Sequence, residues 1–228
     1  MIVAANFKMN KTRKETIEYL KELKKIDFED VVVRVYPPCS ALIEDEIVGA
    51  QNAYPANNGA YTGEIGLEQL KEFKIDKILL GHSERRNILG ESQEFIAKKF
   101  NFYKEQNFEI ILCIGEKLEV RKKGIKAVVE VLKSQLEGID LGYEKLIIAY
   151  EPVWAIGSGI SASVEEIRQT HLEIRKMTNQ PILYGGSVKL SNIKEILNIQ
   201  NVDGVLVGSA SLDVEVFKKM IEIAKEIK

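Results

Sequence analysis

Short apolar runs alternate with segments of helical periodicity along this 228-residue sequence, and this alternation limits the possible folds more than any other feature. Eight runs have the character of strands buried on both faces, and they lie at residues 2–6, 31–35, 47–50, 78–80, 110–114, 146–150, 181–184 and 205–207. Parallel strands need long crossovers, which the intervening helices provide. The pattern therefore predicts an α/β protein, and the length suits one (β/α)8 barrel domain over residues 1–228. A doubly wound open sheet is the alternative that the pattern leaves open.

The composition argues against several functional classes. Hydrophobic residues make up 45% of the chain and charged residues 29%, as in ordinary soluble globular proteins. The formal net charge of −2 provides no basic surface for nucleic acid or an anionic membrane. No window approaches the roughly 18 apolar residues of a membrane span, and the N-terminus has no basic region followed by an apolar stretch. We therefore expect a cytoplasmic protein with no nucleic-acid or membrane partner.

The cysteines and histidines give no sign of a metal or a cofactor. Cys39 and Cys113 lie in unrelated contexts without disulfide or metal-ligand spacing, so we expect two buried free thiols in a reducing compartment. His82 and His171 are far apart in sequence, and no cluster of carboxylates accompanies them. We read His171 as structural because it falls in the middle of a helix.

Several helices can be placed by their caps and periodicity. Thr12 with Glu15 forms a capping box, and the helix that follows is expected to bury Ile17, Leu20 and Leu23. One long helix is expected over about 118–136, and another is expected to begin at an N-cap on Ser191. Between Pro38 and the run at 47–50 there is room for about two helical turns.

Chemically active residues follow the predicted strands. In a parallel barrel the carboxyl ends of all strands meet on one face, which carries the chemistry. The residues at these ends are Asn6, Lys8, His82, Glu151, Gly185, Gly186, Ser187, Gly208 and Ser209. A carboxylate can remove a proton, an imidazole and an ammonium can polarise the neighbouring oxygen, and glycine-bearing turns can bind an anion through backbone N–H groups.

The segment after Glu151 has the composition of a hinged lid. Pro152 fixes φ and Val153 is β-branched, so the start of the segment is stiff. Residues 155–159 are mostly small and can move as a unit over a site that excludes water. On its own, the segment is equally compatible with an ordinary acidic turn.

Four segments in order resemble the signature segments of the triosephosphate isomerase family. They are residues 6–10, 81–86, 150–157 and 184–188, and each lies at the end of a predicted strand. The resemblance implies the (β/α)8 TIM barrel and the interconversion of dihydroxyacetone phosphate and D-glyceraldehyde 3-phosphate through an enediol(ate). It also implies a small triose phosphate as substrate and no cofactor.

The resemblance implies specific roles for these residues. Glu151 would be the base, His82 a neutral electrophile, and Lys8 a positive charge for the substrate, with Asn6 orienting the lysine. Glu84 resembles the glutamate near that lysine in the family. Substrate binding would involve Asn6, Lys8, Gly157, Ser187, Gly208 and Ser209. The lid would comprise Pro152, Val153, Trp154, Ala155, Ile156, Gly157, Ser158 and Gly159, with Trp154 as hinge anchor and with Tyr184 and Ser187 latching it at Gly159 and Ala162.

Two details bear on this assignment. His82 precedes a predicted helical turn, and the positive end of that turn disfavours an imidazolium, which supports a neutral ring. Ser209 stands where many members of the family have a second glycine. Because the implied phosphate contact is a backbone N–H, serine can serve there if the local dihedral angles permit it.

Two rival functions and an assembly state complete the sequence-based expectations. Gly157, Gly159 and Ala162 formally fit a dinucleotide fingerprint, but the glycines come too long after the strand for its tight turn. The second rival is a non-catalytic phosphate-binding barrel. The long loop 51–66, with its tip at Asn58–Glu64, resembles the interface loop of the family, so we expect a homodimer formed through it.

Overall fold

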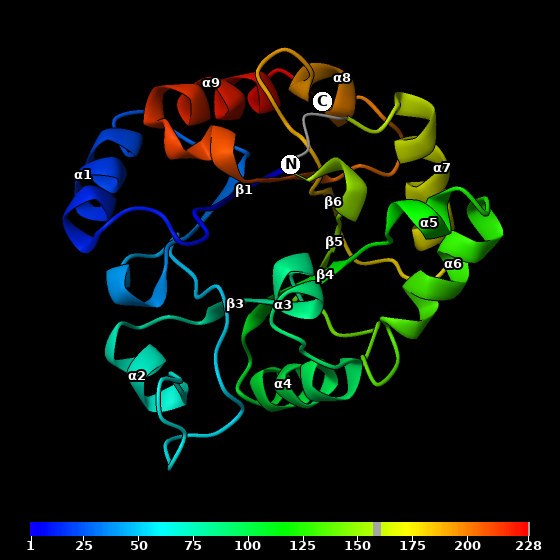
Figure 1. Ribbon diagram of the computed structural model, residues 1–228. Helices are drawn as coiled ribbons and strands as arrows, with labels where there is room; N and C mark the ends of the chain where they lie inside the picture. The colour runs from blue at the N-terminus through cyan, green and yellow to red at the C-terminus, as the bar shows by residue number, and fades with distance from the viewer. Residues whose placement is uncertain (157–160, 228) are drawn as a thin grey trace.

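The computed structural model describes residues 1–156 and 161–227, and within them seven parallel strands form a nearly closed barrel. The strand order around the barrel is β2-β1-β7-β6-β5-β4-β3. Figure 1 shows the helices arranged as an outer ring around the strands. The strands are β1 Ile2–Asn6, β2 Val32–Tyr36, β3 Lys77–Leu80, β4 Glu109–Ile114, β5 Leu146–Tyr150, β6 Ile182–Tyr184 and β7 Gly204–Val207. The barrel is therefore confirmed, and the open doubly wound sheet is wrong.

The expected eighth strand, at residues 47–50, is reduced to two isolated bridges. Val48 bridges to Val35 of β2, and Ala50 bridges to Ile78 of β3. The Gly49 N–H donates to the Val35 carbonyl at 3.0 Å, and the Leu79 N–H donates to the Ala50 carbonyl at 2.8 Å. The Tyr36 ring lies so close to Gly49 that a Cβ there would come within 2.4 Å of it. Because the segment crosses from one strand to the other so quickly, it joins β2 to β3 without forming a ladder.

The core has two parts that follow the two faces of the strands. A large cluster fills the space between strands and helices, and a smaller cluster fills the barrel itself. The smaller cluster consists of Ile2, Ala4, Tyr36, Leu79, Ile111, Cys113, Ile147, Ala149, Leu183 and Leu206. In β1, for example, Ile2 and Ala4 face the interior while Val3 and Ala5 face the helices. The barrel centre is packed, which leaves its ends for binding.

The helices of the described residues are mostly short. They are α1 Arg13–Leu23, α2 Leu67–Glu72, α3 Ser83–Asn87, α4 Gln93–Glu105, α5 Leu118–Arg121, α6 Ile125–Ser134, α7 Val164–Arg175, α8 Ile193–Leu197 and α9 Val214–Lys225. The capping box of Thr12 and Glu15 at α1 is confirmed. No helix among residues 1–156 and 161–227 has the length and apolar character needed to cross a membrane.

Some helix predictions are wrong for local reasons. The expected helix over 118–136 is broken into α5 and α6, because Gly124 takes φ 92 and stops the first turn. On α1, Ile17 is 48% exposed, and Thr16 and Tyr19 are buried instead. Asn192, not Ser191, stands at the N-cap of α8.

The segment after Pro38 also differs from expectation. It forms a single short 3-10 helix, Cys39–Ala41, in place of two helical turns. Cys39 at its start is exposed, so the prediction of two buried thiols holds for Cys113 and is wrong for Cys39.

Candidate active site

A cavity of about 530 Å³ lies at the carboxyl ends of the strands. Its lining comes from β1 and β7 and from the segments that follow β1, β3, β5, β6 and β7, which bring together residues far apart in the sequence. The predicted site and lid residues among its lining are Asn6, Lys8, His82, Glu151, Ile156, Ser187, Gly208 and Ser209. Gly157, Ser158 and Gly159 were also predicted to belong to the site or its lid, and they lie outside the described residues.

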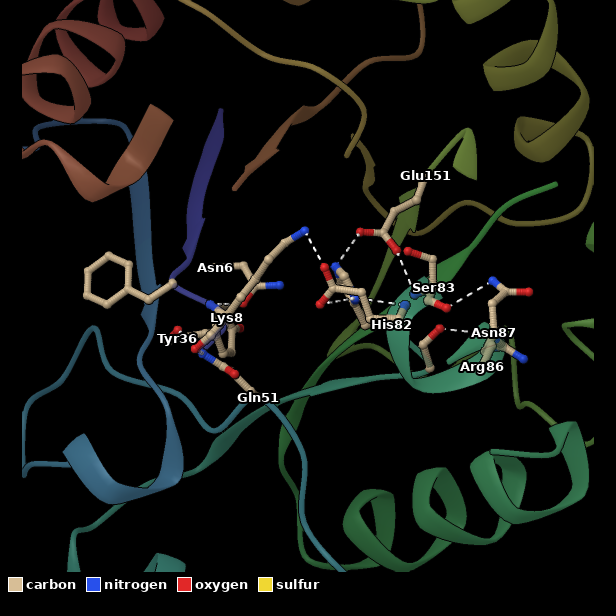
Figure 2. A network of polar contacts seen from close by, with 12 residues as sticks. Asn6, Lys8, Tyr36, Gln51, His82, Ser83, Arg86, Asn87 and Glu151 are labelled. Carbon is tan, nitrogen blue, oxygen red and sulfur yellow. Dashed lines mark hydrogen bonds and ion pairs between the residues drawn. The ribbon is translucent and has the colours of Figure 1, made fainter. Parts of the chain in front are cut away.

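Three hydrogen bonds fix the position of Lys8. Its backbone has φ 52, and its N–H donates to Asn6 Oδ1 at 3.0 Å. Its ammonium donates to Glu84 Oε1 at 2.6 Å. Its carbonyl accepts a hydrogen bond at 2.9 Å from the amide of Gln51, which also donates to the Tyr36 carbonyl. Asn6 and Glu84 thus fix the lysine in the cavity wall, and Gln51 holds its carbonyl (Figure 2).

His82 and Glu151 contact each other directly. His82 Nε2 lies 3.1 Å from Glu151 Oε1, and both side chains are almost fully buried. His82 is the N-cap of α3, and its Nδ1 accepts the Glu84 N–H at 3.2 Å. The other carboxylate oxygen of Glu151 accepts the Ser83 N–H at 3.2 Å. Because Nδ1 accepts from the backbone, the ring proton lies on Nε2 and points at Glu151.

The electrostatics of this pair differ from the sequence-based argument. Burial lowers the pKa of His82, but the neighbouring Glu151 carboxylate outweighs it, so this pKa is raised above its usual range. Burial raises the pKa of Glu151, and His82 with the Ser83 N–H outweighs that effect, so this pKa is lowered. With Glu151 in contact, the imidazole is therefore easier to protonate than the helix end alone would allow.

Two glycines allow the chain to pack closely around Glu151. A Cβ at Gly115 would lie 1.7 Å from the Glu151 carbonyl oxygen, and one at Gly185 would lie 2.9 Å from the Glu151 Cγ. Cys113 faces the barrel interior just below, and burial raises the pKa of its thiol. The carboxylate is thus fixed from beneath by backbone and faces the cavity from above.

Another part of the cavity wall follows the ends of β6 and β7. It consists of the turns after β6 and β7, which include Ser187, Gly208 and Ser209. The Ser187 hydroxyl donates to the Ala155 carbonyl at 2.7 Å, and Asn192 Nδ2 donates to the Ser187 carbonyl at 3.0 Å. This wall has small residues and is suited to receive an anionic group.

The described part of the predicted lid begins with a short 3-10 helix, Val153–Ala155. Trp154 Nε1 donates to Glu116 Oε1 at 3.0 Å, and the Val153 N–H donates to the Glu116 carbonyl at 3.0 Å. Glu116 is fully buried and also binds Arg121 and the Tyr150 hydroxyl. The start of the segment is therefore tied to the end of β4.

Glu116, Arg121 and Gln51 are residues that sequence reasoning missed. Glu116 follows β4, so its place after a strand was an available signal, whereas Arg121 and Gln51 carried none. Three residues of the predicted latch, Tyr184, Ser187 and Ala162, line a neighbouring hollow of about 340 Å³, and the fourth, Gly159, lies outside the described residues.

His171 is buried, with Nδ1 2.9 Å from the Asn201 carbonyl oxygen, and burial lowers its pKa to about 4. It lies outside the cavity lining, as a structural residue should. In the part of the chain that the structure describes, no three His, Cys, Asp or Glu side chains are grouped to hold a metal.

A parallel barrel with a carboxylate, an imidazole and an ammonium in one cavity at its carboxyl end belongs to the class of α/β-barrel enzymes. Residues 1–224 match the family model described as triosephosphate isomerase. The chain belongs to the triosephosphate isomerase family, an isomerase family, so the predicted resemblance and enzyme class are confirmed.

Relatives named triosephosphate isomerase cover nearly the whole chain. The protein of Nitratiruptor sp. is 56% identical over 232 residues, which is 100% of each chain. That of Sulfurovum sp. is 59% identical over 228 residues, covering 97% of this chain and 99% of the relative. That of Wolinella succinogenes is 56% identical, with 97% and 99% covered.

Proposed function

We propose that this chain interconverts dihydroxyacetone phosphate and D-glyceraldehyde 3-phosphate by proton transfer through an enediol(ate). The observation that carries the proposal is the direct contact of Glu151 with His82, beside Lys8, in one cavity. A carboxylate with a lowered pKa is ionised at neutral pH and can act as a base.

Glu151 removes a proton from the carbon next to the carbonyl and returns it to the neighbouring carbon. Glu151 and His82 lie 3.1 Å apart, so a substrate that is bound between them separates the two side chains. Separation moves away the carboxylate that raises the pKa of His82 most, and leaves burial, which lowers this pKa, against the smaller effect of Glu84. The Glu84 N–H remains on Nδ1. His82 then acts as a neutral imidazole that donates its Nε2 proton to the substrate oxygens.

Lys8 supplies positive charge to the substrate anion and to the developing enediolate. Asn6 and Glu84 hold the lysine in position through the contacts to its backbone and ammonium. Backbone N–H groups bind the phosphate, at Gly157, Ser187, Gly208 and Ser209. The segment 152–159 forms the lid, which excludes water from the site. Trp154 anchors the lid through Glu116, and Tyr184 and Ser187 latch it.

A steady-state isomerase assay with glyceraldehyde 3-phosphate tests this proposal, with and without a chelator. We expect turnover that the chelator does not change. Binding of a triose phosphate without turnover would instead support the alternative of a non-catalytic phosphate-binding barrel.

We further propose that the chain forms a homodimer through loop 51–66. Several large apolar side chains are exposed, among them Met9, Tyr61, Ile88 and Leu89, at 94%, 44%, 76% and 63%. Tyr61 at the loop tip stacks on Tyr54 with ring centroids 3.9 Å apart, which presents a preformed tip to a partner. A hollow of about 220 Å³ beside Lys8 and Met9 could receive such a tip. Sedimentation tests this, and a fully active monomer would contradict it.

A cytoplasmic location also belongs to the proposal. Cys39 and Cys113 are free thiols, as is usual in a reducing compartment. Fractionation of cells that produce the chain tests the location, and recovery of the protein in a membrane or exported fraction would contradict it.

A further inference from the structure

The cavity lining contains a charged residue that the mechanism does not use, Lys189. It follows the turn after β6 and lines both the 530 Å³ cavity and the neighbouring 340 Å³ hollow. Its side chain is exposed, and no carboxylate of residues 1–156 or 161–227 makes an ion pair with it.

The backbone of Lys189 is held firmly although its side chain is exposed. The Lys189 N–H donates to Asn192 Oδ1 at 2.7 Å, and the same amide group donates through Nδ2 to the Ser187 carbonyl at 3.0 Å. Asn192 therefore fixes the turn that carries both Ser187 and Lys189. The side chain of Lys189 therefore extends from a fixed turn. It lines the same cavity as Ser187 and Ser209, which are assigned above to the phosphate.

The charges inside the cavity make this ammonium significant. Lys8 is neutralised by Glu84 at 2.6 Å, and His82, even when protonated, is neutralised by Glu151 at 3.1 Å. These four groups therefore carry no net positive charge, and the whole chain carries −2. At long range these paired groups give a phosphate dianion no net attraction, although Lys8 acts on the anion once it is bound. The unpaired ammonium of Lys189, in contrast, attracts the dianion while it is still outside the cavity.

We propose that Lys189 attracts the phosphate dianion of the substrate to the cavity and so raises its rate of capture. Its role is electrostatic and long-ranged, and it takes no part in the proton transfer. The inference rests on the proposed function for the identity of the anion, but binding of inorganic phosphate can test it separately. Glu195 lines the neighbouring hollow together with Lys189 and reduces the attraction without pairing with it.

The test compares K189Q with K126Q. Lys126 is an exposed residue of α6 outside the cavity lining, so both variants change the net charge equally. At an ionic strength of about 0.01 M we expect K189Q to lower kcat/KM about threefold with kcat close to that of the parent. At about 0.5 M the difference should disappear because the charges are screened. K126Q should match the parent throughout.

Inhibition by inorganic phosphate gives a second measurement that needs only binding. The inhibition constant at low ionic strength should rise about threefold in K189Q and should be unchanged in K126Q. Loss of kcat that salt does not relieve would mean that Lys189 supports the turn and would overturn the proposal, as would identical kinetics in K189Q and the parent. If the parent itself has no isomerase activity, the proposed function fails, and direct titration with phosphate still decides the role of Lys189.

Discussion

The two ends of the barrel each hold a charged pair that reaches across strands, and the pairs differ in what they leave free. Near the amino end, Arg34 of β2 donates to Glu109 of β4 through Nε at 2.8 Å and Nη2 at 2.7 Å. At the carboxyl end, His82 and Glu151 share one contact beside an open cavity.

The difference lies in how completely each pair is satisfied. The fork of Arg34 matches both oxygens of Glu109, so neither group has a strong preference for another partner. Glu151 uses one oxygen for a backbone N–H and the other for His82, and a ligand can replace the second contact. The Arg34–Glu109 pair therefore stabilises the barrel near its amino end, whereas the His82–Glu151 pair at the carboxyl end remains available for chemistry.

Removing the carboxylate at the carboxyl end should give the largest effect. We expect E151Q to lower kcat at least about a thousandfold, because the base is lost. Steady-state kinetics measure this, and inhibition by inorganic phosphate should be largely retained. At the amino end, E109Q is the matched control, and its kcat should stay near that of the parent. A comparable loss of kcat in both variants would contradict the division of roles.

Substitution of Lys8 should give the second-largest effect. K8M removes the ammonium that faces the substrate, and we expect binding of an anionic transition-state mimic to weaken about a hundredfold. Isothermal titration of the mimic measures this directly. Unchanged affinity would show that the ammonium serves only to pair with Glu84.

Breaking the amino-end pair should change stability and leave activity intact. R34M leaves Glu109 without its partner, and since the two side chains are 18% and 20% exposed we expect a loss of about 2 kcal/mol in the free energy of unfolding. Urea denaturation provides the measurement. The double variant R34M/E109M should recover much of the loss, and a double variant as unstable as R34M would argue against the pairing.

The smallest effect concerns the titration of His82. Its pKa is raised above its ordinary value of 6.5 by Glu151, so the pair's contribution to stability is complete below 6.5 and is lost as the pH rises through the raised pKa. On the acid side, Glu151 has a lowered pKa, so its contribution is present above its ordinary value of 4.5 and is lost as the pH falls through the lowered one. In E151Q the pKa of His82, followed by NMR, should fall relative to the parent, and an unchanged value would contradict the role of Glu151.

The sequence predicts the framework well and the contacts poorly. Strands such as 146–150 were evident because both of their faces are buried, and the Thr12 cap is a local pattern. The split at Gly124 was missed because one glycine within a helical pattern does not by itself end the helix. Residues 47–50 are apolar enough for a strand, and their short pairing depends on where β2 and β3 lie in space.

In the candidate site, too, the sequence predicts which strand-end residues meet but not the long-range contacts that hold them. Asn6, Lys8, His82 and Glu151 could be placed together because strand ends meet on one face of a barrel. The contacts of Gln51 with Lys8 and of Glu116 with Trp154 join loops over long sequence separations, and no local pattern indicates them. Glu84 was identified only through the resemblance to the family.

The bridge at residues 47–50 also has a consequence for the tolerance of the barrel to change. It meets β2 and β3 at two points, and Gln51 directly after it fastens the chain to the Lys8 and Tyr36 carbonyls. We therefore expect a change of length between Pro38 and Ile47 to be taken up in that loop, without shifting any of the six strand pairings or moving the lysine. The barrel thus has one place where an engineer could graft a new segment and still keep the cavity intact.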